Sequence, residues 1–177
     1  MIYVFLAEGF EEIEALTPVD LFRRCELDVK TVGINSNIIR SSRGVPVITD
    51  IDANEILLDN NIKMIVLPGG LPGTLNLEKS QKVQEAIDFC IENDKYIAAI
   101  CAAPSILAHK GLLDNKNATC SPGFETQLPN AIFTGDPVCQ DGKIITGRSA
   151  GASIEFSLKL VEALISKERA EMLKGCL

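Results

Sequence analysis

The stretch Tyr96-Ile97-Ala98-Ala99-Ile100-Cys101-Ala102-Ala103-Pro104 joins an apolar segment to the start of a helix. Its five leading residues are typical of a buried strand, and the small residues before Pro104 predict a sharp turn. In open α/β sheets, ligands bind at the carboxyl ends of the strands, which is where this turn would lie. The stretch therefore predicts a nucleophile elbow with the sulfur of Cys101 at its corner.

The same alternation of a short apolar run with a longer amphipathic run recurs along the chain. It is seen as Ile2–Leu6 then Ile13–Cys25, as Lys63–Leu67 then Val83–Ile91, and as Tyr96–Ile100 then Pro104–His109. This pattern indicates βαβ units around a mainly parallel sheet. Because the 177 residues are 46% hydrophobic and contain no repeat or linker, we expect one α/β domain over residues 1–177.

Further segments complete the expected fold. Pro18 lies inside the first helical pattern, where it predicts a kink or a tight first turn. The remaining predicted elements are strands at Val29–Ile34 and Val45–Thr49 flanking a polar turn, a short helix at Ala53–Leu58, a hairpin from Val138 to Thr146, a helix at Ile154–Ile165, and a last helix at Lys167–Lys174 capped by Ser166.

Charge and cysteine content exclude several classes of function. The net charge of −7 and the pI of about 4.8 argue against direct binding to nucleic acid or to anionic lipid. No segment has the composition of a signal peptide or a membrane span, so we expect a cytoplasmic protein. Its six cysteines would then stay mostly reduced. Since there is one histidine and no C-x-x-C pair, we expect no metal and no other cofactor.

Cys101 is the strongest candidate for a catalytic residue. A free cysteine has a pKa of about 8.5, and the positive potential of a helix N-terminus lowers it. The alternative interpretation is a packed apolar cysteine at a strand end, which is the usual role of a buried cysteine. The turn of small residues after Cys101 favours the reactive thiol.

A second strand is predicted to end beside this turn, at the glycines of Met64-Ile65-Val66-Leu67-Pro68-Gly69-Gly70. Paired glycines allow a close approach to a bound group, so the amides of Gly69 and Gly70 would face an anion beside Cys101. Together with the Ala102 amide, Gly70 would form an oxyanion hole. The alternative is an ordinary βα turn. The spacing matches neither G-x-G-x-x-G nor a Walker loop, which excludes nucleotide binding on motif grounds.

Glu14 is the candidate partner of the thiol. Glu11 and Glu12 are explained by the preference of acidic residues for the first turn of a helix. Glu14 would instead point towards the strand ends, where burial and a neighbouring thiolate would keep its carboxyl protonated. His109 lies eight residues beyond Cys101, roughly 12 Å along a helix, which argues against a Cys-His dyad.

These segments resemble the ThiJ/PfpI superfamily, in particular the branch named for the Parkinsonism-associated protein deglycase. The resemblance rests on Ala7–Glu14 with Pro18–Asp20, on Leu67–Gly70, on Ala98–Pro104 and on Thr146–Arg148. It implies a flavodoxin-like three-layer sandwich of the class I glutamine amidotransferase type, a reactive Cys101, its partner Glu14, and amides of Gly70 and Ala102 around the sulfur. Many members carry histidine just before the proline that is Pro122 here, whereas this chain has Ser121.

The resemblance also implies a choice of functions. Members are described as glyoxalases that convert methylglyoxal to lactate without glutathione, as deglycases acting on glycated groups, and as oxidation-sensing chaperones. Our leading hypothesis is an enzyme in which Cys101 attacks a small aldehyde and Glu14 carries protons. The alternative is a sensor in which Cys101 is oxidised to sulfinate. An amidase or peptidase is the weaker alternative, because no base is expected beside Cys101.

We also expect a homodimer. This expectation comes mainly from the resemblance, and secondarily from Arg23, Arg24 and Arg43, which resemble positions that face a dimer partner.

Overall fold

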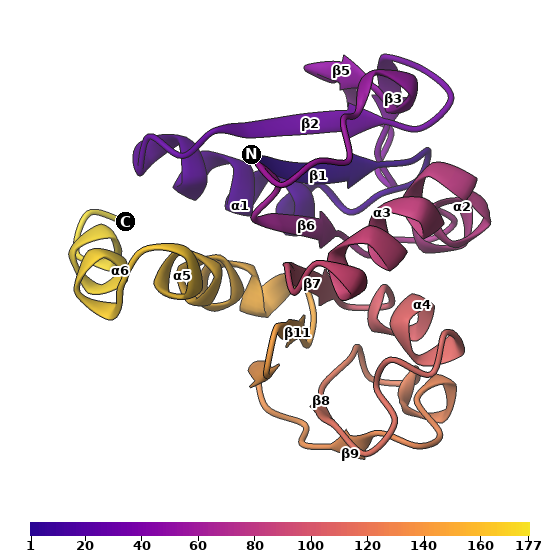
Figure 1. The fold of residues 1–177 in the computed structure, drawn as a ribbon, viewed down its shortest axis with the longest axis vertical. Helices are drawn as coiled ribbons and strands as arrows, with labels where there is room; N and C mark the ends of the chain where they lie inside the picture. The colour runs from indigo at the N-terminus through magenta and orange to yellow at the C-terminus, as the bar shows by residue number, and fades with distance from the viewer.

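A seven-stranded sheet forms the centre of the computed structural model, which describes residues 1–177 (Figure 1). Its strands are β1 (Ile2–Leu6), β2 (Val29–Gly33), β5 (Ile51–Asp52), β6 (Met64–Leu67), β7 (Tyr96–Ile100), β10 (Val138–Asp141) and β11 (Ile144–Gly147). They lie in the order β10-β11-β7-β6-β1-β2-β5, and every neighbouring pair is parallel except β10 with β11. The predicted mainly parallel sheet and its closing hairpin are therefore confirmed.

Helices cover both faces of this sheet (Figure 1). One face packs against α1 (Glu12–Arg24), α5 (Ser153–Leu164) and α6 (Lys167–Lys174). The other packs against α2 (Gly73–Lys79), α3 (Gln81–Glu92) and α4 (Pro104–His109). The protein is thus a flavodoxin-like three-layer α/β sandwich, as the resemblance implied.

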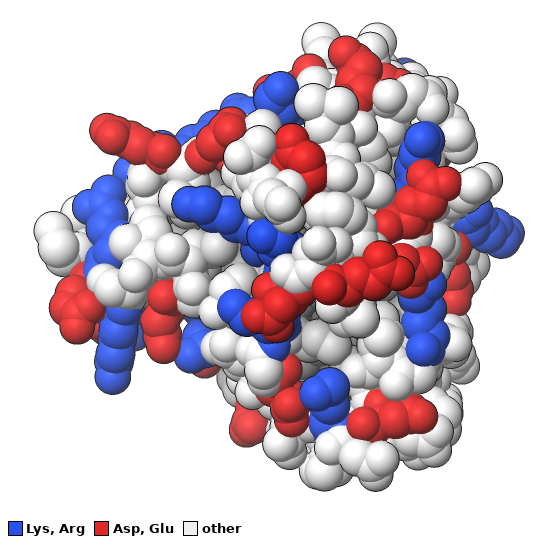
Figure 2. Space-filling model, viewed as in Figure 1, with Lys and Arg blue, Asp and Glu red and all other residues white.

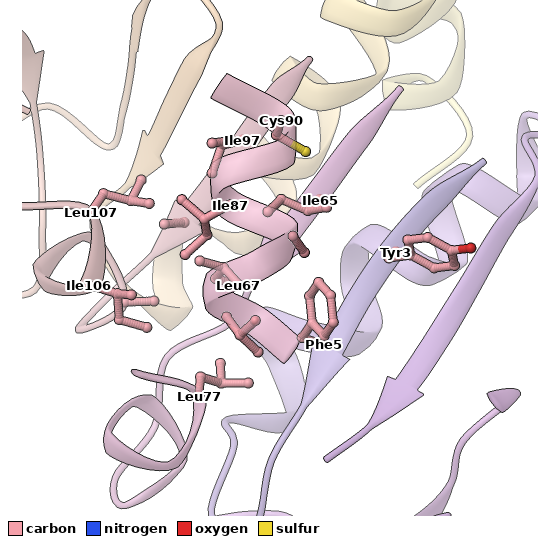
Figure 3. Close-up of a cluster of buried hydrophobic side chains, with 14 of the residues drawn as sticks. Tyr3, Phe5, Ile65, Leu67, Leu77, Ile87, Cys90, Ile97, Ile106 and Leu107 are labelled. Carbon is pink, nitrogen blue, oxygen red and sulfur yellow. The ribbon is translucent and has the colours of Figure 1, made fainter. Parts of the chain in front are cut away.

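Strand β1 shows how one sequence supplies both layers of the core. Side chains alternate across a strand, so Tyr3 and Phe5 enter the cluster under α3, while Val4 and Leu6 enter the cluster under α1 and α5. Figure 3 shows the first cluster, with Phe5, Ile65 and Leu67 of the sheet facing the helices. A strand covered on both faces must be apolar throughout, which explains the uninterrupted run at Ile2–Leu6.

The order of the strands changes direction at the centre of the sheet. From β1 the chain builds outwards through β2 to β5, and then returns to β6 on the opposite side of β1. Ligands in such sheets bind at the carboxyl ends of the strands where this direction changes. Here the segments that follow β1, β6 and β7 meet at that edge.

Several short elements lie outside the main sheet. Strand β3 (Ile38–Arg40) pairs antiparallel with β4 (Pro46–Ile48), and β8 (Asn117–Ala118) pairs parallel with β9 (Ile132–Phe133). Three single 3₁₀ turns complete the chain: η1 (Ala53–Glu55), η2 (Glu125–Gln127) and η3 (Ala150–Ala152).

Some local predictions were wrong or incomplete. The helix expected at Ala53–Leu58 is only the turn η1, because Asp52 and Glu55 close a capping box and the chain is extended at Ile56. Pro18 is inside one continuous helix, α1, rather than in its first turn. The strands β3, β5, β8 and β9 and the helix α2 were not predicted from the sequence. The predicted cap at Ser166 is confirmed, since its side chain accepts a hydrogen bond from the Arg169 amide.

Acidic and basic side chains are interspersed over the face of the molecule shown in Figure 2. Many of the charged groups form ion pairs within the chain, such as Arg24 with Asp20 and Lys110 with Asp88. Exposed pairs of this kind contribute little to stability, so the apolar core carries most of it. No helix has both the length and the apolar composition required to cross a membrane.

His109 links two segments that lie far apart in sequence. Its Nδ1 lies 2.5 Å from Oε1 of Glu78 on α2, and its Nε2 lies 3.1 Å from Oε1 of Gln127 on η2. Because an acceptor oxygen lies beside each ring nitrogen, both hydrogen bonds can form only when both nitrogens carry protons. The hydrogen bond to Glu78 accordingly raises the pKa of His109, while partial burial lowers it. Glu78 is the one charged group that acts on His109, because Gln127 is neutral.

This arrangement predicts a pH-dependent contribution to stability. Because the pKa of His109 is higher in the folded chain than the unfolded value of about 6.5, the contribution is present below pH 6.5 and is lost as pH rises through the folded pKa. The free energy of unfolding, measured with denaturant, should therefore be about 0.5 kcal/mol lower for Glu78→Gln than for the wild type at pH 6, which is the size typical of exposed pairs. At pH 9 the two free energies should be equal. Glu85→Gln, which breaks the exposed Lys82–Glu85 pair, is the control and should show no such convergence. If the free energy of unfolding depends on pH in the same way in the wild type and in Glu78→Gln, the His109–Glu78 hydrogen bond does not contribute to stability.

Candidate active site

Cys101 occupies the corner between β7 and α4 in a strained backbone conformation. Its φ of +67° lies in the left-handed region, which residues with a side chain seldom adopt. Two hydrogen bonds hold it there: its amide donates to the carbonyl of Gly147 at 2.9 Å, and its carbonyl accepts from the amide of Ser121 at 2.8 Å. This is the backbone of a nucleophile elbow, in which strain and fixed neighbours expose one side chain at the end of a strand.

Glu14 reaches the same edge of the sheet from the first turns of α1. Its side chain is 1% exposed, and its Oε2 accepts a hydrogen bond from the Gly69 amide at 2.9 Å. The same oxygen lies near the side chain of Cys101, since a Cβ built at Gly69 would lie 2.6 Å from both groups. Burial, helped by the nearby charge of Glu11, raises the pKa of Glu14 to about 7, although Cys101 and the Gly69 amide act in the opposite direction. The structure thus brings the two predicted residues together.

Gly69 is the point of closest approach between these two groups. A Cβ atom at this position would lie 2.6 Å from Cβ of Cys101 and 2.6 Å from Oε2 of Glu14. Any side chain would therefore push the thiol and the carboxyl out of place. We expected the Gly69 amide to face a bound oxyanion, but it is occupied by Glu14 and serves to orient that carboxyl.

The amides of Gly70 and Ala102 have no such competing partner. Gly70 has a φ of +90°, and a Cβ there would lie 2.5 Å from the Glu11 amide nitrogen, so the position requires glycine. The Gly70 amide donates to no group of the protein. The Ala102 amide donates to no carbonyl of the chain, and it acts to lower the pKa of the neighbouring Cys101 thiol. These two donors remain available to stabilise negative charge that develops at or next to the sulfur.

The thiol itself is strongly influenced by Glu14. Burial, followed by the charge of Glu14 and its hydrogen bond, raises the pKa of Cys101 to about 12, while Ser121 and the Ala102 amide act to lower it. The expectation that the helix start would dominate and lower this pKa is therefore wrong while Glu14 is ionised. The physical reason is that burial of the thiol, followed by the charge of Glu14, outweighs the effect of α4, which has only six residues.

One proton controls the state of this pair. When Glu14 is neutral, its repulsion of the thiolate disappears and its O–H can donate to the sulfur. A thiolate at Cys101 and a protonated Glu14 therefore belong to the same state. Conversely, an ionised Glu14 keeps the proton on the sulfur.

Ser121 is the residue of this site whose role the sequence analysis did not find. Its amide donates to the carbonyl of Cys101 at 2.8 Å, and its side chain acts to lower the pKa of that thiol. The one signal in the sequence was its place before Pro122, at a position that the resemblance associates with the site. His109, in contrast, is bound to Glu78 and Gln127 and does not pair with Cys101.

The other cysteines have different surroundings. Cys90 and Cys120 are buried, and burial raises the pKa of each thiol. Cys25 and Cys139 are partly buried, whereas Cys176 is exposed near the C-terminus. Cys101 lines none of the hollows bordered by Met1 and Tyr96, by Glu8 and Gln81, or by Ile154 and Lys174.

Comparison with known proteins agrees with this geometry. The model of the DJ-1/PfpI family matches residues 1–163. Protein dj-1beta of Drosophila melanogaster is 36% identical over 178 residues, which cover 98% of this chain and 95% of the relative. A Schizosaccharomyces pombe protein described as glutathione-independent glyoxalase DJ-1 is 30% identical, over 94% of this chain and 92% of its own length.

Solved structures are similar over the same extent. The crystal structure of Drosophila melanogaster DJ-1beta superposes with a TM-score of 0.93 at 34% identity, covering 99% of this chain and 96% of that one. The structure of oxidized Toxoplasma gondii DJ-1 gives a TM-score of 0.90 at 34% identity, covering 98% and 95%. From its fold, its cysteine corner and these relatives, we conclude that the chain belongs to the DJ-1/PfpI family.

Proposed function

We propose that this protein is a cysteine-dependent enzyme for small reactive aldehydes, which converts methylglyoxal to lactate without glutathione. The observation that carries the proposal is the contact of the Cys101 thiol with a buried carboxyl, Glu14, whose pKa is raised to about 7. A relative described as a glutathione-independent glyoxalase supports the choice of reaction.

The first step is addition of the thiol to the aldehyde. The sulfur of Cys101 forms a bond to the aldehyde carbon, and the electron pair of the C=O bond moves to oxygen. The free amide of Gly70, together with that of Ala102, would donate hydrogen bonds to this oxyanion. Protonation of the oxygen then gives a hemithioacetal.

The second step transfers a proton between two carbon atoms. A base removes the proton from the carbon bonded to sulfur, which gives an enediol, and the adjacent carbon is then protonated to leave a thioester on Cys101. Glu14 suits both transfers, since a carboxyl with a pKa of about 7 is present in both forms near neutral pH. Water finally hydrolyses the thioester, which releases lactate and restores the thiol. The net reaction adds one water to methylglyoxal and requires no oxidant or reductant.

Related reactions would use the same groups. Early glycation products arise from such aldehydes, so a deglycase activity would need the same nucleophile and proton carrier. An amidase or peptidase is less well supported, because the single histidine is bound to Glu78 and Gln127 instead of Cys101.

Loss of the thiol should abolish turnover. We expect Cys101→Ser to lower the rate of lactate formation from methylglyoxal at least about a hundredfold, because the nucleophile is removed while the fold is kept. Cys176→Ser, which changes the exposed cysteine, is the matched control and should retain the wild-type rate. Lactate should be measured with pure protein in the absence of glutathione. Equal rates for Cys101→Ser and wild type would rule out the proposal.

Substitution of Glu14 should separate reactivity of the thiol from turnover. Glu14→Gln keeps a hydrogen-bond donor but removes the charge that raises the pKa of Cys101, so alkylation of Cys101 at pH 8 should be as fast as in wild type or faster. Turnover should nevertheless fall about 100-fold or more, because glutamine cannot carry a proton. Glu14→Leu also removes the donor, and we expect it to react more slowly than Glu14→Gln.

Glu12→Gln is the control for this series, since it changes an acid of the first turn of α1 that binds Ser41 and does not affect the pKa of Glu14 or of Cys101. It should alter alkylation and turnover by less than about threefold. If Glu14→Leu leaves both rates unchanged, Glu14 is a structural acid at the helix start and has no role in the reaction.

Oxidation of Cys101 is a second candidate function. It is favoured by the structure of a Toxoplasma gondii relative that was solved in an oxidized form. Each of two peroxide molecules would transfer one oxygen atom to the sulfur and leave as water, which converts the thiolate to a sulfinate. The amides of Gly70 and Ala102 and a neutral Glu14 would then hold this anion.

We also infer that the protein forms a homodimer through an apolar patch on α1 and the β3–β4 hairpin. These elements are joined by the hydrogen bond from Ser42 to Glu11. The patch consists of the exposed side chains Ile13, Leu16, Ile38, Val45 and Ile48. Arg23 and Arg24, which resembled dimer-facing residues, are paired with Asp50 and Asp20 of the same chain, so the apolar patch gives the better support.

Sedimentation velocity tests the dimer. The wild type should sediment at twice the chain mass of 19.2 kDa, and Ile48→Glu should shift it towards the monomer, because Ile48 is 78% exposed in the single chain and a charge there would be buried in the dimer. Met172→Glu introduces the same charge at an exposed position on α6 and should leave the dimer intact. A wild type that is monomeric at all concentrations would refute the dimer.

A further inference from the structure

Gly69 is inserted into the hydrogen bonds that begin α1. In a capping box, the acidic side chain at the third helical position accepts a hydrogen bond from the amide of the N-cap residue. Glu11 is the N-cap of α1 and Glu14 is at the third position, but they do not bond to each other in this way. Instead, the Glu11 amide donates to the carbonyl of Gly69 at 3.0 Å, and the Gly69 amide donates to Oε2 of Glu14 at 2.9 Å. The backbone of Glu11 therefore holds the residue that orients the Glu14 carboxyl.

The carboxylate of Glu11 is itself fixed by the turn between β3 and β4. The hydroxyl of Ser42 donates to Oε2 of Glu11 at 2.9 Å, and the amide of Ser42 donates to the carbonyl of Phe10 at 2.7 Å. Side chains three positions apart on a helix are neighbours. A negative charge is thus held at the N-cap, next to the side chain of Glu14.

No positive charge compensates for these two acids. The groups that act on Glu14 from the neighbouring segments are the thiol of Cys101 and the amide of Gly69, and Glu11 acts from the same helix. Burial is the main cause that raises the pKa of Glu14 to about 7, and the charge of Glu11 adds to it. The other charged residues near the start of α1 are bound elsewhere or form no ion pair: Glu8, Glu12, Arg40 and Arg43.

We propose that Glu11 is a positioning residue for Glu14: its backbone fixes Gly69 against the Glu14 carboxyl, and its own negative charge, anchored by Ser42, opposes a second negative charge on Glu14. The proposal deepens the proposed function, in which Glu14 exchanges a proton near neutral pH. It concerns the ionisation of Glu14, which can be measured whether or not methylglyoxal is a substrate.

A titration of Glu14 by NMR tests this proposal. The side-chain carboxyl carbons of glutamate are labelled with ¹³C, and the Glu14 signal is identified by its loss in Glu14→Gln. Chemical shifts are followed between pH 4 and 10 in the wild type, Glu11→Gln, Glu11→Ala and Glu12→Gln. Glu11→Gln removes the charge but keeps an oxygen that accepts from Ser42, whereas Glu11→Ala removes both. Every variant keeps the backbone hydrogen bond to Gly69, and the NMR spectra show whether each one is folded.

We expect the Glu14 midpoint, near pH 7 in the wild type, to fall by about 0.5 unit in Glu11→Gln and by a similar amount in Glu11→Ala, because both remove the neighbouring charge. Alkylation of Cys101 by iodoacetamide at pH 7.5 should slow about threefold in both, since the thiolate requires a neutral Glu14 and 0.5 unit corresponds to about a threefold change. Glu12→Gln, which changes the neighbouring acid that binds Ser41, should move the midpoint by less than about 0.2 unit.

The proposal is overturned if Glu11→Gln leaves the Glu14 midpoint at its wild-type value, or if Glu12→Gln lowers the midpoint as far as Glu11→Gln does. A shift in Glu11→Ala alone would also overturn it, because the hydrogen bond to Ser42 and not the charge would then be responsible. Absence of lactate formation in the wild type would refute the proposed function, while the titration would still decide the role of Glu11.

Discussion

The structure depends most on the burial of one carboxyl group, Glu14, where β1, β6 and β7 end. A carboxyl taken out of water is unfavourable in its charged form, and here one backbone amide, that of Gly69, and one sulfur are its partners. The approach needed for these contacts leaves no space for a side chain at Gly69. The parallel sheet makes these contacts possible, because it brings three segments that are distant in sequence to one edge. The chemistry we propose is therefore a property of how the layers meet and not of any single loop.

The positions of Cys101 and Glu14 could be predicted because each follows a strand whose apolar character is unmistakable. Ile2–Leu6 and Tyr96–Ile100 are buried on both faces, and the direction of parallel strands fixes where the following residues lie. The elements that escaped prediction are short or weakly patterned. β3 has three residues in a separate hairpin, and α2 begins at Gly73, directly after a segment rich in glycine and proline.

The electrostatics of the site were harder to predict than its location. A helix start beside a cysteine suggests a lowered pKa, but sequence does not give the distance from Glu14 to the sulfur or the degree of burial. Both are tertiary properties, and in this fold they outweigh the helix while Glu14 is ionised. The same limit applies to Ser121, which approaches Cys101 only because backbone hydrogen bonds attach its segment to Cys101 and β11. The sequence therefore indicates which groups meet in the site. It does not indicate how far each group shifts the pKa of its neighbour.

The absence of free space at Gly69 has a stereochemical consequence. A group attached to the sulfur of Cys101 is blocked on the side where Gly69 lies against the cysteine, and its oxygen is drawn towards the amides of Gly70 and Ala102. In the proposed reaction, the two faces of an aldehyde bound in this way are not equivalent, and Glu14 would deliver a proton from only one direction. A chiral product formed in such a site should consequently have a single handedness, which is set by the shape of the backbone around one glycine.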